Sequence, residues 1–162
     1  MKALTGLITL IFLLQFATDL DSIRSSYFSG PKTEETAKSF NEMMEIVDAS
    51  TAILKAYKGA SFALQAQYGQ GIKEKKEFFE LAVTNIEAAV QEDHDNPEIR
   101  LIRLSVQENS PRIVKYKDNM EDDKALILEE FDSLTEAVKK CIRDYATHSD
   151  FFSEEEKAQV LN

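Results

Sequence analysis

The sequence predicts an all-α protein built from antiparallel helical hairpins, with about six to eight helices in all. Three observations lead to this prediction. Apolar residues recur every three or four positions along most of the chain, as they do on one face of a helix. From residue 19 onward, no stretch alternates polar and apolar residues over the length of a strand. The chain also has only five Gly and three Pro in 162 residues, too few for the many turns of a β-sandwich or barrel.

Residues 1–18 are interpreted as a secretory signal peptide and are set apart from the fold. Lys2 supplies a positive charge, residues 3–16 are mainly apolar, and Ala17 offers a small residue near the expected cleavage site. The apolar run is shorter than the ~20 residues that span a bilayer. We therefore expect an exported protein, periplasmic or extracellular, whose residues 19–162 form a single helical domain. A membrane anchor and a buried first helix are the alternatives.

The first half of the chain carries local signals for where helices begin. Thr33 is a capping residue followed by two acids, and Ser50 or Thr51 begins the next helix. The clearest apolar stripe places Ile86 on an inward face and Glu87 just off it. In this half we expect helices over residues 20–28, 34–48, 51–67 and 73–92.

The second half carries similar signals. Asn96-Pro97 is a cap followed by a Pro in the first helical turn, and Ser153-x-x-Glu156 is a capping box. The helix after Pro97 is apolar around much of its circumference, so we expect it near the middle of the fold. One long stripe, which includes Phe131, predicts a single inward-facing helix. The helices expected here cover residues 97–108, 111–116, 119–145 and 153–162.

The middle of the chain resembles the tetratricopeptide repeats, which are stacked helical hairpins. Tyr57-x-x-Ala60-Ser61-x-x-Leu64 is similar to the first half of the repeat, and Ala82-x-x-x-Ile86-x-x-Ala89 to the second. Leu101-x-x-Leu104-Ser105 opens the pattern again, but Glu108 then stands where a large apolar residue belongs. The resemblance covers roughly residues 54–105 and implies small residues at helix contacts. The whole chain also resembles small secreted bacterial helical proteins, and that resemblance implies no activity.

The charge balance argues against several classes of partner. The net charge is −10 at pH 7, and it becomes −11 once Lys2 is removed with the signal. Because affinity for nucleic acid comes largely from Lys and Arg, we expect no nucleic-acid partner. Binding to an anionic membrane surface is disfavoured for the same reason, and we expect no stable membrane span after cleavage. The single Cys141 lies on an apolar stripe, which favours buried packing over a reactive thiol.

No pattern of residues predicts catalysis, a cofactor or a metal site. The motifs of hydrolases, phosphate loops and zinc proteases are missing from the sequence. His94 lies between two Asp residues, but Glu98 and Leu104 stand where a calcium loop needs Gly and Glu. The acid runs at 121–123 and 154–156 are explained as first-turn acids, which favour the positive end of a helix. We expect that the protein is not an enzyme.

One segment reverses the local charge and supplies the candidate partner-binding residues. Between residues 98 and 117 five basic and two acidic side chains give a net charge of +3. Arg100 and Arg103 lie one turn apart and either point into a groove or pair with the protein's own acids. Guanidinium groups at that spacing suit a carboxylate of a partner. The candidate partner-binding residues are Arg100, Arg103, Arg112 and Lys115.

Two functional hypotheses follow from these residues. The first is an exported interaction module that holds a partner protein or peptide in a groove beside the helix 99–108. The second, from another class, is a small-ligand carrier or enzyme whose site is assembled from dispersed carboxylates such as Glu42, Glu45 and Glu80. A shallow groove flanked by Arg favours the module, whereas two carboxylates in a deep pocket favour the carrier or enzyme.

Overall fold

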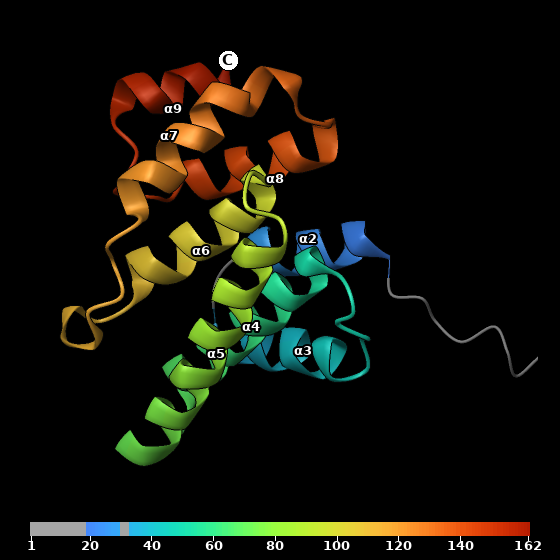
Figure 1. Ribbon diagram of the computed structural model, residues 1–162, viewed down its shortest axis with the longest axis vertical. Helices are drawn as coiled ribbons and strands as arrows, with labels where there is room; N and C mark the ends of the chain where they lie inside the picture. Colours follow the sequence, from blue (N-terminus) through green and yellow to red (C-terminus); the bar gives the residue numbers. More distant parts are fainter. Residues whose placement is uncertain (1–18, 30–32) are drawn as a thin grey trace, which may run out of the picture.

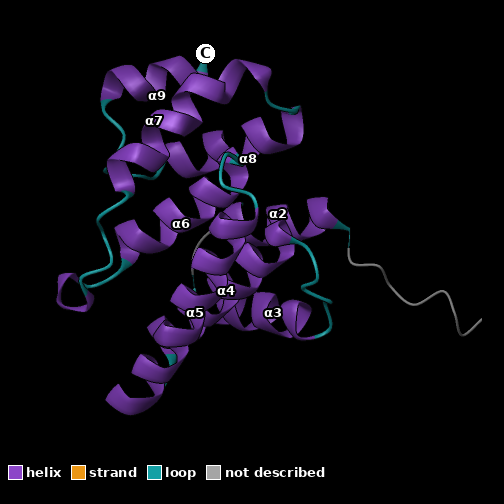
Figure 2. Ribbon diagram, in the orientation of Figure 1, coloured by secondary structure: helices purple, strands orange, loops and turns teal. Residues whose placement is uncertain are grey.

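The fold is all-α, and it is seen in a computed structural model that describes residues 19–29 and 33–162. These residues form eight α-helices and two short 3₁₀ helices and contain no strand (Figures 1 and 2). The predicted fold class is therefore confirmed, while the predicted signal peptide lies outside the described residues. The α-helices are α2 (Leu20–Phe28), α3 (Glu34–Glu45), α4 (Ala52–Tyr68), α5 (Ile72–Glu92), α6 (Pro97–Asn109), α7 (Met120–Glu130), α8 (Glu136–Ala146) and α9 (Glu154–Leu161), and the 3₁₀ helices are η1 (Arg112–Val114) and η2 (Phe131–Ser133).

The predicted caps begin the helices to which they were assigned. The Thr33 hydroxyl accepts from the backbone N–H of Thr36 and completes a capping box at α3. Asn96 Oδ1 accepts from two backbone N–H groups at the start of α6. Ser153 forms the second capping box, at the start of α9. Each of these bonds satisfies a backbone N–H that the first turn of a helix leaves without a partner.

The prediction of one long helix over residues 119–145 is wrong, because two helices with a break between them occupy this stretch. After α7 the chain tightens into η2, where the Ser133 hydroxyl donates to the carbonyl oxygen of Glu130 at 2.8 Å. Leu134 is then extended, and Thr135 precedes α8. Phe131 lies in the break and is buried. The apolar pattern of the sequence therefore continues through the break, although the helix does not. The helix expected over 111–116 is likewise reduced to the single turn of η1.

Helix α6 lies at the centre of the molecule, as predicted. Every residue from 98 to 107 is buried. Figure 1 shows α6 between a group formed by α7, α8 and α9 and a second group formed by α2, α3, α4 and α5. Because helices cover α6 on all sides, its polar residues can be accommodated only by partners within the protein.

The hairpin of α4 and α5 packs closely along most of its length. The approach is tightest at Gly59, where a Cβ atom would lie 2.6 Å from Ile86 Cγ1 and 2.9 Å from the Ala82 carbonyl oxygen. Ile86 is fully buried, so its predicted inward position is confirmed. The small residues expected at helix contacts meet other helices: Ser61 donates to Asn41 of α3 and Ser105 bonds Tyr27 of α2.

Candidate functional site

Arg100 and Arg103 are buried and paired with the protein's own acid, which is the second of the two alternatives that the sequence left open. Asp123, in the first turn of α7, has no exposed surface and accepts from both guanidinium groups. Arg100 Nη1 donates to Asp123 Oδ1 at 2.8 Å. Arg103 donates to both carboxylate oxygens, with Nε at 2.8 Å and Nη2 at 2.6 Å. This forked geometry is the strong form of an Arg–carboxylate pair.

The same network continues to the segment that follows α6. Arg103 Nη1 donates to Glu87 at 3.1 Å, and the Tyr116 hydroxyl donates to the other oxygen of Glu87 at 2.6 Å. Burial is the largest single effect on Arg103 and lowers its pKa, but the bond to Asp123 and the charges of Asp123 and Glu87 together raise the pKa above the usual value. Burial and the bond to Glu87 raise the pKa of Tyr116. Glu87, which the sequence places just off the apolar stripe, is therefore a structural acceptor.

A second buried acid ties α2 to α6. Glu98 accepts from Arg24 at both carboxylate oxygens, at 2.8 and 2.6 Å. The Tyr57 hydroxyl donates to the same carboxylate at 2.7 Å, and burial together with this acid raises the pKa of Tyr57. Glu98 is thus satisfied within the fold and is not available to a ligand.

Glu108 anchors the segment between α8 and α9. Its carboxylate accepts from the hydroxyl of Ser149 at 2.8 Å and from the backbone N–H groups of Asp150 and Phe151 at 2.9 and 3.1 Å. The Tyr145 hydroxyl also donates to it. A carboxylate with this many donors explains why an acid stands where the repeat pattern expects an apolar side chain.

Arg112 and Lys115, the other two predicted site residues, are exposed on the loop around η1. In the described part of the chain neither side chain has an ion-pair partner. Between them Ile113 is 87% exposed and Val114 is 38% exposed. Lys115 has a φ of 50°, the left-handed conformation, which closes the turn and is uncommon for a residue with a side chain. The loop therefore presents apolar and basic side chains together.

The first turns of α5 add to this exposed region. Ile72 is 89% exposed, and residues 71–77 are all exposed. The Phe79 ring meets the Tyr116 ring edge-on at a centroid distance of 5.9 Å, which places the loop beside α5. We call residues 72–79 and 111–117 the tip surface. It carries six basic and two acidic side chains, hence a net charge of +4, on a chain whose net charge is −10.

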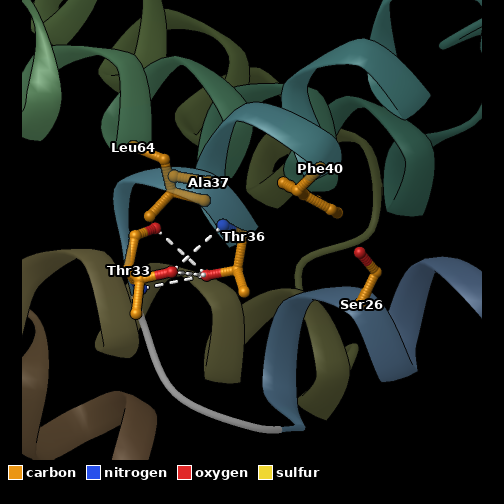
Figure 3. A pocket seen from close by; sticks show the side chains of 6 residues that line it. All are labelled: Ser26, Thr33, Thr36, Ala37, Phe40 and Leu64. Carbon is orange, nitrogen blue, oxygen red and sulfur yellow. Dashed lines mark hydrogen bonds between the residues drawn. The ribbon is translucent and has the colours of Figure 1, made fainter.

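Two hollows of the described surface lie away from the tip surface. One, lined by Ala37, Phe40 and Leu64 beside the Thr33–Thr36 capping box, is too tight to admit a water molecule (Figure 3). The other is a half-open groove of about 210 Å³ between α2 and α8. Its charged groups are already bonded to protein groups, because Arg24 pairs with Asp21 and Glu98, and Lys140 pairs with Asp144.

The carboxylates of the carrier or enzyme hypothesis are not buried. Glu42, Glu45 and Glu80 are each exposed, and two of them pair with a Lys on their own helix. Within the described residues, no group of three or more His, Cys, Asp or Glu side chains is placed to hold a metal ion. No helix among these residues is long and apolar enough to cross a membrane.

Cys141 is packed inside the fold, as its position on the stripe predicted. It is 3% exposed on α8, and burial together with the charge of Glu98 raises the pKa of its thiol to about 12. At that pKa the thiol stays protonated at neutral pH and is a poor nucleophile.

The geometry thus divides the four predicted site residues into a buried pair and an exposed pair. Arg100 and Arg103 hold Asp123, whereas Arg112 and Lys115 belong to the tip surface. Ile72, Ile113 and Phe79 join the exposed pair. The local charge reversal was the sequence signal for the loop, and it did not extend to Ile72 and Phe79. Comparison of the chain with protein-family models, with curated proteins and with solved structures finds no match.

Proposed function

We propose that the protein is an exported helical interaction module that binds a partner protein or peptide through the tip surface. The observation that carries this proposal is the exposure of Ile72 and Ile113, at 89% and 87%, beside basic side chains. Clustered apolar side chains rimmed by polar groups mark interaction sites, since leaving them in water is unfavourable. The hairpin packing and the resemblance to tetratricopeptide repeats support the same role, because such folds commonly bind other proteins.

The proposed contact surface differs from the groove beside α6 that the sequence favoured. Because helix α6 is covered by its neighbours, we assign partner binding to the exposed Arg112 and Lys115 on the loop. Arg103 supports that loop indirectly, because it bonds Glu87 and Glu87 in turn holds the hydroxyl of Tyr116. In this proposal the buried pair positions the surface, and the exposed pair touches the partner.

The proposal is tested by placing a photo-crosslinking amino acid at Ile113 in cells of the source organism. We expect a discrete adduct that contains the protein and one partner. The same amino acid at Glu129, an exposed position of α7, serves as the control and should give no such adduct. No adduct from Ile113, or the same adducts from both positions, would contradict the proposal.

A further inference from the structure

We infer that the partner segment recognised by the tip surface is an acidic amphipathic helix whose aliphatic face lies along the first turns of α5. This inference rests on the proposed function and names the chemistry of the partner. It requires that α5 has an uncovered face, that the loop lies within reach of that face, and that the charges there suit carboxylates.

The uncovered face is the N-terminal continuation of a stripe that is occupied further along the helix. Positions 72, 76, 79, 83 and 87 follow the four- and three-residue steps that share one face of a helix. At the far end of this stripe Glu87 holds Tyr116, and in the middle Phe79 touches the ring of Tyr116. Toward the N-terminus the same face continues with Lys76 and Ile72, whose side chains are exposed.

The loop lies within reach of this face. Ile72 is seven residues before Phe79, about 10 Å along the helix axis. Ile113 is three residues before Tyr116, so at most about 11 Å of chain separates them. Each of the two exposed isoleucines therefore lies within about 11 Å of a residue in this one ring contact, near enough for one helical segment to touch both. In Figure 1 the loop projects at the left of the molecule and the start of α5 projects at its bottom.

The charges at the tip surface select an acidic partner. Arg112 and Lys115 flank the apolar pair Ile113 and Val114, and no acidic side chain of the described residues neutralises either of them by an ion pair. A helix that exposes aliphatic residues on one face and Glu or Asp on its flanks complements this pattern. Apolar contact supplies the affinity, and the charge pattern supplies the orientation and the rejection of basic partners.

A protein helix fits this surface better than an anionic bilayer or a nucleic acid. Glu74 and Glu77 lie within two turns of Ile72, where a sheet of phosphates would repel them. Outside the tip surface the chain is strongly acidic, which opposes approach to any extended anionic surface. A single helix avoids the repulsion of Glu74 and Glu77 and that of the acidic remainder of the chain, because its carboxylates contact only the basic side chains that face them.

The test uses two synthetic 18-residue peptides with the same Leu face, one with Glu and one with Lys on the polar face. We expect the Glu peptide to shift the backbone amide resonances of residues 72–79 and 112–117 of the purified protein. We also expect it to bind at least tenfold more tightly than the Lys peptide. Ile113→Asp should weaken binding at least tenfold, whereas Ile46→Asp, at a residue that is 73% exposed at the end of α3, should not change it. A circular dichroism melt of each variant checks that it is folded.

Several outcomes would overturn the inference. These are equal affinity for the two peptides, shifts confined to other residues, or binding to vesicles of phosphatidylcholine with 30% phosphatidylglycerol in preference to the Glu peptide. If crosslinking at Ile113 yields a protein partner but the Glu peptide is not preferred, the acidic helix is wrong and the proposed function stands. If crosslinking yields nothing, the proposed function itself fails.

Discussion

At the scale of single residues, the most consequential contact is the one that Asp123 makes with two arginines. Its carboxylate is fully buried and accepts three hydrogen bonds from Arg100 and Arg103. Removing charges from water costs several kcal/mol per ion, and only close pairing offsets this cost. The three side chains therefore form a unit in which each member depends on the others.

We predict that Asp123→Ala lowers the free energy of unfolding by about 3–5 kcal/mol, the range found when one partner of a buried ion pair is removed. The substitution leaves two guanidinium groups buried without their acid. Urea unfolding followed by circular dichroism measures the loss. Asp122→Ala, at the exposed neighbouring position, is the control and should change stability by less than about 0.5 kcal/mol.

The matching double variant, Arg100→Ala with Arg103→Ala, strands the buried Asp123 carboxylate instead and should also be destabilised. If either of these variants melts like the wild type, the network is not the structural unit described above. If the double variant is stable but gives no crosslink at Ile113, Arg100 and Arg103 would instead contact the partner directly.

At the scale of elements, the contact of α4 with α5 depends on the missing side chain at Gly59. A Cβ there would lie 2.6 Å from Ile86 Cγ1 and 2.9 Å from a backbone oxygen of α5. We predict that Gly59→Val costs about 1–3 kcal/mol of stability, as overpacking of a tight core does, and that it separates the two helices. A thermal melt measures the cost. Gln67→Val, at an exposed position of the same helix, should be nearly neutral, and an equal loss there would point to β-branching rather than packing.

The elements also show which features could be predicted from sequence. Helix starts at Thr33, Asn96 and Ser153 were predictable because the capping side chain and its partner lie within three residues. The break between α7 and α8 was not, because the apolar stripe continues through Phe131 and hides the change of direction. A local η2 turn interrupts the helix without interrupting its apolar pattern.

The candidate site was harder to predict for a similar reason. Asp123 sits in the first turn of α7, where an acid is expected to favour the helix dipole, and nothing local marks it as the partner of Arg103 twenty residues earlier. Only tertiary packing brings α6 and α7 together. The segment that reverses the charge was visible in sequence, but its division into buried Arg100 and Arg103 and exposed Arg112 and Lys115 required the fold.

At the scale of the whole molecule, buried thiol and phenol groups should make the free energy of unfolding depend on pH in the alkaline range. Burial raises the pKa of Cys141 from 9.0 to about 12 and that of Tyr27 from 10.0 to about 12. The folded state keeps these protons while the unfolded state loses them, so the free energy of unfolding falls as pH rises from about 9 to 12. Urea midpoints at pH 8, 9, 10 and 10.5 should decrease in order. Cys141→Val should flatten the first part of this decrease, and midpoints that stay constant would contradict the prediction.

The contact between α2 and α8 has a consequence for how this fold can vary in length. In a linear repeat protein each unit touches only its neighbours, so units can be added or removed at an end. Here the first described helix packs against the seventh, with the Ser29 hydroxyl donating to Asp144 at 2.6 Å. This contact between α2 and α8 joins the start of the series of hairpins that surrounds α6 to a helix near its end. Insertion of a further hairpin between α2 and α8 would break this contact, so the segment between them can gain length only in its loops, such as the loop around Ile113.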